Sequence, residues 1–345
     1  MRSRAAPRRC WPGAGASVRV LVTGASSLLG GAVACRLQAR GDDVTVFQRR
    51  PAEVSAQGCR QLLGDVTDAA AVRQAAHGQD AVVHLAARVS VTGPWAAFEE
   101  VNVDGTANMV AGARAAGVAR LVHVSSPSVA HSGRALVGAG AEPADPVGAS
   151  GHYARSKALA EQLALASDGP ALAVVAVRPH LVWGPGDTQM VGRIVQRARA
   201  GRLALVGDGA ALIDSTYVDD AAAALVAALD RAPQAHGQAL VVTGGQPRPV
   251  AEVLARICRA AGAPPPTRRV PLGVARIAGA AVEAVWAFSR RSDEPPMTRF
   301  LAEQLATAHW FDQRLTRALL GWAPEVGLDE GFARLRAWYA ADPRR

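Results

Sequence analysis

Two side chains that lie one helical turn apart give the strongest chemical signal in this sequence. Tyr153 and Lys157 are four residues apart, so on a helix the phenol and the ammonium lie on the same face. Lys157 is the single lysine among 38 basic residues, and all the others are arginines. A nearby ammonium lowers the pKa of a phenol towards neutrality, where the phenol can exchange protons with a substrate. We expect an acid–base pair here; the alternative is an ordinary surface pair on a helix.

Ser126 is the expected third member of this group. It follows the apolar segment 120–125, which the pattern predicts to be a buried strand. In an open parallel sheet the carboxyl ends of the strands border the ligand crevice, where a serine hydroxyl can polarise a substrate oxygen. Serines in loops are otherwise mostly caps and turns, so the role of Ser126 depends on Tyr153 and Lys157.

A glycine-rich turn between a predicted strand and a predicted helix indicates a dinucleotide site. Small residues in such a turn let backbone N–H groups and the helix dipole face a pyrophosphate. If position 27 requires a positive φ, the serine there costs about 1–2 kcal/mol. A turn of this kind can also serve only to connect strand and helix. The candidate residues of the cradle are Gly24, Ser26, Ser27, Leu28, Leu29 and Gly30.

The end of the second predicted strand indicates which dinucleotide binds. NAD-binding folds usually have a carboxylate there for the ribose 2′-hydroxyl, whereas this sequence has Arg49 and Arg50. Guanidinium groups bind a 2′-phosphate through charge-assisted hydrogen bonds, so the residues favour NADPH, with NAD possible. The alternative is two solvated arginines in an arginine-rich chain.

The elements that must position these residues alternate between strand and helix. This order predicts an α/β fold with a doubly wound parallel sheet (Rossmann) and a smaller helix-rich C-terminal substrate lobe. The predicted strands are 18–23, 44–47, 80–85, 120–125 and 172–177, with short ones at 203–206, 239–242 and 267–270. We divide the chain into a disordered basic tail (1–17), a dinucleotide-binding domain (18–183) and a substrate lobe (184–345), with 213–243 interleaved with the Rossmann core.

Composition excludes several other classes of protein. Half of the 345 residues are hydrophobic, and no uninterrupted apolar run is long enough to span a bilayer. The formal charge of +9 falls to +5 without the four arginines of residues 1–17, which is too diffuse to predict nucleic-acid binding. Four scattered cysteines and eight histidines show no metal-ligand spacing. We expect a cytoplasmic protein without a metal site or a transmembrane span.

These residues resemble those of the extended short-chain dehydrogenase/reductase family. The resemblance covers 18–341, and Ser27 departs from it because the pattern normally has glycine there. It implies that Asp65 and Val66 contact adenine, and that Ala86, Pro179, Val182, Tyr153 and Lys157 lie beside the cofactor. The motifs are Thr23-Gly24 to Gly30, Gly64-Asp65-Val66, His84 to Ala87, Asn102-Val-x-Gly-Thr106, Ser126, Tyr153, Lys157, Arg178-Pro179, Trp183 to Asp187 and Leu320-Gly-Trp-x-Pro324.

A narrower resemblance is to the 2-alkyl-3-oxoalkanoate reductases of bacterial long-chain olefin biosynthesis, which lie beside the 3β-hydroxysteroid dehydrogenases. It implies NADPH-dependent reduction of a long-chain β-keto acid to the 3-hydroxy acid, with a homodimer or an assembly with other olefin-biosynthesis enzymes as further possibilities. A 3β-hydroxysteroid dehydrogenase-like enzyme and a nucleotide-sugar epimerase or dehydratase are alternatives. A non-catalytic dinucleotide sensor is the alternative from another class, but a sensor has no need of Tyr153 with Lys157.

The narrower resemblance is carried by four segments. They are Ser126 to His131, Trp183 to Asp187, Ala200 to Leu203 with Val206 to Gly209, and Pro296 to Leu305.

Overall fold

The computed structural model describes most of the chain. The described residues are 17–51, 58–90, 92–131, 133–289, 295 and 297–342. Residues 1–16 of the expected basic tail lie outside them.

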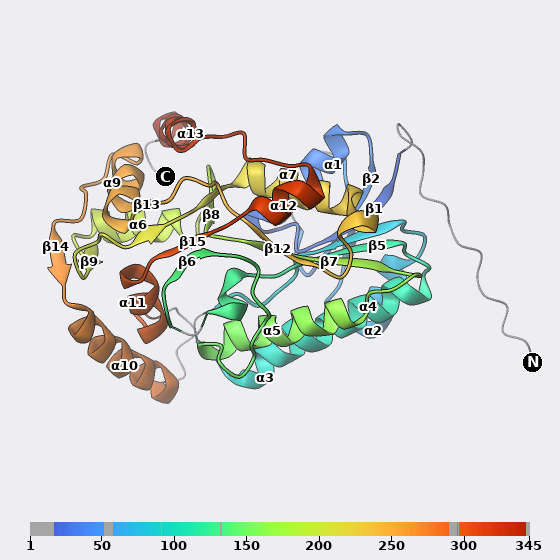
Figure 1. The fold of residues 1–345 in the computed structure, drawn as a ribbon, viewed down its shortest axis with the longest axis horizontal. Coiled ribbons are helices and arrows are strands. Elements are labelled where there is room, and N and C mark those ends of the chain that lie inside the picture. Colours follow the sequence, from blue (N-terminus) through green and yellow to red (C-terminus); the bar gives the residue numbers. More distant parts are fainter. Residues whose placement is uncertain are drawn as a thin grey trace, which may run out of the picture.

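A seven-stranded parallel sheet forms the centre of the structure (Figure 1). Its strand order is β12-β7-β5-β4-β1-β2-β3, and every neighbouring pair is parallel. The central strands are apolar runs that are buried along most of their length, as expected when helices cover both faces. This confirms the predicted doubly wound sheet. The strands are β1 (Arg19–Thr23), β2 (Asp43–Gln48), β3 (Arg60–Leu63), β4 (Ala81–His84), β5 (Arg120–Val124), β7 (Ala173–Pro179) and β12 (Ala239–Val242).

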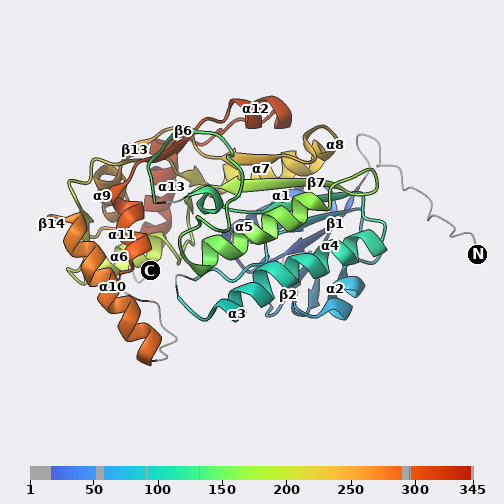
Figure 2. The same ribbon diagram turned by 60° about the horizontal axis from the view of Figure 1, so that its bottom comes forward.

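Helices cover both faces of this sheet. Helices α1, α7 and α8 pack with the apolar cluster on one face, and α2, α4 and α5 cover the other, where they lie side by side in Figure 2. Strand β12 extends the sheet beside β7, although it follows β7 by some 60 residues. The helices are α1 (Leu28–Ala39), α2 (Ala69–Ala76), α4 (Gly105–Ala115), α5 (Gly151–Ala166), α7 (Val218–Asp230) and α8 (Ala232–Ala235).

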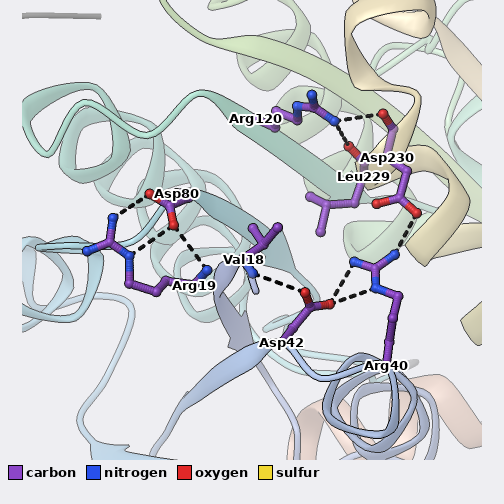
Figure 3. Close-up of polar contacts among 8 residues, drawn as sticks. All are labelled: Val18, Arg19, Arg40, Asp42, Asp80, Arg120, Leu229 and Asp230. Carbon is purple, nitrogen blue, oxygen red and sulfur yellow. Dashed lines mark hydrogen bonds and ion pairs between the residues drawn. The ribbon is translucent and has the colours of Figure 1, made fainter. Parts of the chain in front are cut away.

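Ion pairs fasten the amino-terminal edge of the sheet (Figure 3). Arg19 at the start of β1 forms two side-chain hydrogen bonds with Asp80, which precedes β4, at 2.9 and 2.5 Å. Arg40 bridges Asp42 and Asp230, and thereby links the end of α1 to the end of α7. The contacts tie neighbouring elements together where the strands begin.

Arg120 makes a second kind of contact at this edge. It is the first residue of β5 and is only 7% exposed. Its Nη1 donates to the backbone oxygens of Leu229 (3.1 Å) and Asp230 (2.6 Å) at the end of α7 (Figure 3). A cation at a helix C-terminus satisfies free carbonyls and complements the helix dipole. Burial lowers the pKa of Arg120 to about 10.

The remaining elements form a lobe beside the carboxyl edge of the sheet (Figure 1). Its strands are short and pair as β13-β10-β15-β6, β11-β8 and β14-β9. The expected short strands at 203–206 and 267–270 correspond to β9 and β14. The strands are β6 (Leu136–Ala139), β8 (Val182–Trp183), β9 (Ala204–Val206), β10 (Leu212–Ile213), β11 (Thr216–Tyr217), β13 (Arg248–Pro249), β14 (Arg268–Val270) and β15 (His309–Phe311).

The lobe helices enclose a second apolar core. Trp183 stacks on Phe332 with ring centroids 4.5 Å apart, and Trp183 Nε1 donates to Ser215 Oγ at 3.0 Å. Among the described residues, no helix has the length and apolarity needed to cross a membrane. The helices are α6 (Val191–Arg199), α9 (Val250–Ala260), α10 (Leu272–Ser289), α11 (Arg299–Ala306) and α13 (Leu328–Ala341), while α12 (Arg314–Leu320) lies against β12 and α7.

Candidate active site

The turn from β1 to α1 has the backbone form of a dinucleotide cradle. Gly24 has φ +73°, and a Cβ there would lie 2.9 Å from the backbone nitrogen of Ala86. A Cβ at Gly30 would overlap the carbonyl oxygen of Gly24. Both positions therefore require glycine, for conformation at Gly24 and for close approach at both. Such a turn fits a pyrophosphate at the helix N-terminus.

Ser27 fits this turn without strain. It is the N-cap of α1 and has φ −83°, so the energetic cost that a positive φ would bring does not arise. Its Oγ accepts from Gly30 N (3.1 Å) and donates to Gly24 O (2.8 Å). The serine thus satisfies one free N–H of the helix, as serine N-caps commonly do.

Thr23 holds the neighbouring strand end against the turn. Its Oγ1 accepts hydrogen bonds from the backbone N–H groups of Leu85 (3.1 Å) and Ala86 (3.0 Å). It also contacts Nδ1 of His84 at 2.9 Å. Ala86, expected beside the cofactor, is thereby fixed next to Gly24.

The residues expected at the adenine end meet at the ends of β2 and β3. Arg49 and Arg50 follow β2 and are exposed, and Nη1 of Arg49 lies 3.9 Å from Oδ2 of Asp65. Val66 is buried against Gly105 of α4. The contact between Arg49 and Asp65 was not anticipated, because β3 was not predicted. Its sequence, Arg-Gln-Leu-Leu, has a polar half and no strand alternation.

Ser126 and Tyr153 face each other at the carboxyl edge of the sheet. Ser126 begins the 3-10 turn Pro127–Ala130 directly after β5, and Tyr153 lies in the first turn of α5. The Ser126 hydroxyl lies close enough to Tyr153 to oppose the rise in the pKa of the phenol, and Ser128 Oγ donates to Ser126 Oγ at 2.9 Å. The expected hydroxyl pair is therefore formed by two elements that are distant in sequence.

Lys157 lies one turn further along α5 and is 3% exposed. Its Nζ donates to the backbone oxygen of Val124, the last residue of β5, at 2.6 Å. Burial lowers the pKa of Lys157 to about 8, and the Glu161 carboxylate opposes this shift. A compact ammonium is thus held between α5 and β5, the strand that precedes Ser126.

The expectation that Lys157 lowers the pKa of Tyr153 is wrong for this structure. Burial raises the pKa of Tyr153, and the hydrogen bond with Ser126 opposes the rise. The ammonium is directed to the Val124 carbonyl and is not among the groups that shift the phenol. Tyr153 therefore stays protonated at neutral pH, which is the form that a proton donor needs.

A buried ion pair between Glu161 and Arg178 lies one helical turn beyond Lys157. Glu161 and Arg178 are 2% and 1% exposed, and their side chains meet at 2.5 Å. Arg178 also donates to the backbone oxygen of Glu142 at 2.7 Å. This pair fastens α5 to β7 and places a carboxylate one turn from Lys157. Two features of the sequence could have indicated this ion pair: the motif Arg178-Pro179, and an acidic residue, Glu161, four positions after Lys157.

Asn102 is a positioning residue. In the sequence it stood out only as part of the motif Asn102-Val-x-Gly-Thr106, and no role was predicted for it. It is 1% exposed and lies in the π-helical segment Glu99–Asp104. Its Oδ1 accepts from Arg88 N (2.7 Å), and its Nδ2 donates to Ser156 Oγ (2.8 Å). Asn102 therefore ties the segment after β4 to α5, next to Tyr153 and Lys157.

Pro179 and Val182 lie where the sheet meets the lobe. Pro179 ends β7 beside β12, and Val182 in β8 pairs with Thr216. Between them, Leu181 has φ +42°, the one positive φ of a non-glycine among the described residues. The structure therefore brings these two residues to the same side of the sheet as Ser126, since both follow β7 at its carboxyl end.

Three comparisons with known proteins agree with this geometry. A profile of the NAD dependent epimerase/dehydratase family matches residues 20–243. The chain belongs to this family. It is 42% identical to 2-alkyl-3-oxoalkanoate reductase of Stenotrophomonas maltophilia (strain K279a) over 331 residues, which are 94% of this chain and 100% of the relative. It is 28% identical to 3-beta-hydroxysteroid dehydrogenase of Mycolicibacterium neoaurum, over 93% of this chain and 91% of that one.

Solved structures show the same fold. MoeE5 in complex with UDP-glucose and NAD is 26% identical, with a TM-score of 0.73 over 94% of this chain and 99% of that chain. Together, these matches confirm the predictions of the family, of the Rossmann fold and of an NAD(P)-dependent enzyme of the oxidoreductase class.

Proposed function

We propose that this chain reduces the ketone of a long-chain 2-alkyl-3-oxoalkanoate to the 3-hydroxy acid, with NADPH as cofactor. The observation that carries the proposal is the hydroxyl pair of Ser126 and Tyr153 beside the buried ammonium of Lys157. The substrate class comes from the 42% identical relative, which matches along its whole length.

The glycine turn fits the dinucleotide, because the backbone packs closely at Gly24 and Gly30 and the turn leads directly into the N-terminus of α1. When bound, the reduced nicotinamide supplies a hydride to the carbonyl carbon. Ser126 holds the carbonyl oxygen by a hydrogen bond, and Tyr153 transfers its hydroxyl proton to that oxygen. The carbon thus gains the hydride and the oxygen gains the proton, which leaves a secondary alcohol and a phenolate on Tyr153.

Lys157 is proposed to hold the cofactor. Its compact ammonium donates to Val124 O and can bind the hydroxyls of the nicotinamide ribose with its other donors. Ser126 donates to the phenolate of Tyr153 once the product oxygen has left. Asn102 holds α5 in place through Ser156, so the three groups keep their mutual geometry.

Activity of paired tyrosine variants tests this proposal. β-Keto acids lose carbon dioxide spontaneously, so the reverse reaction is cleaner: a 2-alkyl-3-hydroxyalkanoate with NADP⁺, followed by nicotinamide absorbance. We expect Tyr153→Phe to lower kcat by about 10³-fold or more, because the proton-transfer group is gone. Tyr339→Phe in α13 is the matched control and keeps wild-type turnover. Equal turnover in Tyr153→Phe contradicts the proposal.

Arg49 and Arg50 are proposed to select NADPH. Both are exposed after β2, where guanidinium groups can reach a 2′-phosphate. Asp65 lies 3.9 Å from Arg49 and offsets part of its charge, so Arg50 provides the less compensated cation. We expect Arg50→Ala to lower the ratio of kcat/KM for NADPH over NADH by about tenfold, through the lost charge-assisted hydrogen bond. An unchanged ratio in an Arg49→Ala, Arg50→Ala double variant contradicts NADPH selection by these residues.

A substrate panel separates this activity from the alternatives. Turnover of a 3β-hydroxysteroid, or interconversion of a UDP-sugar without net change in NADP⁺, would replace the proposed substrate class while leaving the roles of Tyr153 and Lys157. A tightly bound dinucleotide with no turnover of any of these compounds would favour a sensor. A homodimer, an assembly with other olefin-biosynthesis enzymes and a cytoplasmic location stay predictions, which size-exclusion chromatography, copurification and cell fractionation test.

A further inference from the structure

A buried histidine at the end of β4 lies between the two halves of the candidate site. His84 is the last residue of β4 and is 1% exposed. In the sheet, β4 lies between β1, which leads into the glycine turn, and β5, which leads to Ser126. A contact through His84 can therefore fix the cofactor half of the site relative to the catalytic half.

Threonine hydroxyls engage both ring nitrogens of His84. Nδ1 lies 2.9 Å from Oγ1 of Thr23, the last residue of β1, and Nε2 lies 3.3 Å from Oγ1 of Thr106 in α4. The neighbouring His123 is also buried, with its ring centroid 5.8 Å away, but neither of its nitrogens has a hydrogen-bond partner among the described residues. The two hydrogen bonds are therefore specific to His84 and are not common to the buried histidines of this face.

The hydrogen bonds of Thr23 determine where the proton of His84 lies. Oγ1 of Thr23 accepts from the backbone N–H groups of Leu85 (3.1 Å) and Ala86 (3.0 Å), which occupy both of its lone pairs. The Thr23 hydroxyl must therefore donate to Nδ1 of His84, and the ring proton lies on Nε2. Burial, and after it the charge of Lys157, lowers the pKa of His84 to about 3, so the ring is neutral at pH 7.

A chain of hydrogen bonds continues from His84 to the backbone of Tyr153. Nε2–H of His84 donates to Thr106 Oγ1, whose hydroxyl donates to the backbone oxygen of Asn102 at 2.6 Å. The Asn102 amide donates to Ser156 Oγ at 2.8 Å, and the Ser156 hydroxyl donates to the backbone oxygen of Tyr153 at 2.9 Å. Each of these donors has its acceptor, and one imidazole ring joins the cradle end of the chain to the helix end.

We propose that His84 is a positioning residue that fixes the proton donor Tyr153 relative to the bound dinucleotide. This inference rests on the proposed reductase function. Proton transfer and hydride transfer to one carbonyl require a fixed separation of phenol and nicotinamide, and a displacement of about 1 Å can cost about 10²-fold in rate. The cradle end of the chain holds Ala86 beside Gly24, and the helix end holds the first turn of α5. A neutral imidazole suits this link, because a rigid ring accepts on one side and donates on the other.

Imidazole NMR of the full-length protein tests the hydrogen-bond chain without any assumption about activity. Two-bond proton–nitrogen correlations on ¹⁵N-labelled histidine should show His84 neutral at pH 7 with its proton on Nε2. The signals of His84 are those that are absent from the spectrum of His84→Leu. A proton on Nδ1 of His84, or a charged ring, overturns the proposal.

Paired threonine variants separate positioning from stability. Thr106→Val keeps the shape of the side chain and removes the acceptor of Nε2–H, so we expect kcat to fall about tenfold with the NADPH Kd unchanged. Thr106→Ser keeps the hydroxyl and should recover most of the loss. Thr316→Val is the matched control, because Thr316 in α12 is equally buried, at 2% exposed, and donates to Val241 O at 2.8 Å. We expect a similar loss of stability from this control but wild-type kcat.

A leucine at position 84 interrupts both ends of the chain. In His84→Leu we expect kcat to fall about tenfold and the NADPH Kd to rise about fivefold, the equivalent of about one hydrogen bond, because Thr23 loses its acceptor. In the double variant His84→Leu, Thr106→Val, kcat should fall no further, since both changes break the same chain. Losses of kcat that multiply in the double variant, or an unchanged NADPH Kd in His84→Leu, overturn the proposal.

The two hypotheses fail in distinguishable ways. Wild-type kcat in a folded Thr106→Val variant overturns the positioning role even where the wild type is an active reductase. A wild type without ketoreductase activity overturns the proposed function, while the NMR spectrum and the NADPH Kd of His84→Leu still decide whether His84 links the cradle to α5.

Discussion

The two edges of the seven-stranded sheet use buried cations in different ways. At the amino edge, Arg120 donates to two carbonyls at the end of α7, and these contacts join a helix to a strand (Figure 3). At the carboxyl edge, Lys157 donates to one carbonyl, Val124 O, which leaves the other ammonium donors available beside Ser126 and Tyr153. A guanidinium that joins a strand to a helix end serves stability, whereas an ammonium with further donors can serve a substrate or a cofactor.

The largest expected effect separates activity from stability at the carboxyl edge. Lys157→Met should lower kcat by about 10²–10³-fold, because the ammonium proposed to hold the nicotinamide ribose is lost and the cofactor is misplaced. The free energy of unfolding should stay equal or rise, since an apolar side chain of similar length replaces a buried cation. Steady-state kinetics and urea unfolding of the same samples measure both. A Lys157→Met variant with full activity would show that the buried cation at the carboxyl edge, like the one at the amino edge, is not needed for catalysis.

The pH dependence of the same lysine gives the next effect. Burial lowers the pKa of Lys157 to about 8 from 10.5, so the folded protein loses this proton before the unfolded chain does. Between these values the unfolded state binds more protons, and the free energy of unfolding therefore rises with pH by up to about 3 kcal/mol relative to Lys157→Met. Over the same window kcat should fall, because the ammonium is lost. Urea unfolding and kcat measured from pH 7 to 10 test this. A difference in the free energy of unfolding between wild type and Lys157→Met that does not vary with pH contradicts it.

The amino edge should respond in the opposite sense. Arg120→Met should lower the free energy of unfolding by about 2 kcal/mol, since two carbonyls at the end of α7 lose their donor and the helix dipole loses a cation. We expect kcat to stay unchanged. Arg60→Met, at an exposed arginine of β3, is the control, with a change within about 0.5 kcal/mol. A large loss of kcat in a folded Arg120→Met variant would show that the edges are coupled.

The last comparison concerns two glycines with nearly the same φ. Gly24 has φ +73° at the carboxyl edge, and Gly78 has φ +78° at the amino edge. An added Cβ at Gly78 meets no atom within 4 Å, whereas at Gly24 it meets the backbone of Ala86. Gly78→Ala should therefore lower stability by only about 1–2 kcal/mol, the cost of the left-handed conformation. Gly24→Ala should lose about 1–3 kcal/mol more, with weaker NADPH binding. Thermal unfolding and cofactor titration measure the pair, and equal losses would contradict the role of close approach.

The sequence predicted the central sheet well because its strands are buried on both faces. Runs such as Val174 to Val177 are apolar without interruption, and little else fits such a run between two helices. Strand β3 was missed because it lies at the edge of the sheet, where burial does not constrain its composition. Phe98 and Trp183 are 1% and 2% exposed and belong to the packed interior.

The site was predictable in its members and less so in its electrostatics. The spacing of Tyr153 and Lys157 fixes a common helix face, and the glycine turn fixes a cradle, so these groups follow from local geometry. The direction of the Tyr153 pKa shift does not follow from local geometry, because it depends on burial and on which acceptor binds the Lys157 ammonium. Val124 O is 33 residues away in sequence, and its contact with Lys157 exists only once α5 has packed on β5.

The amino-acid order alone thus determined the alternation of strands and helices, the residues that require glycine and the pairing of a phenol with the single ammonium, because each follows from backbone geometry over a few residues. Tertiary structure alone decided that Asn102 meets Ser156, that Glu161 meets Arg178 and that the rings of His180 and His309 meet edge to face. Those contacts join residues up to 129 positions apart, and the energy of a buried polar atom depends on its partners in space and not on its neighbours in the chain.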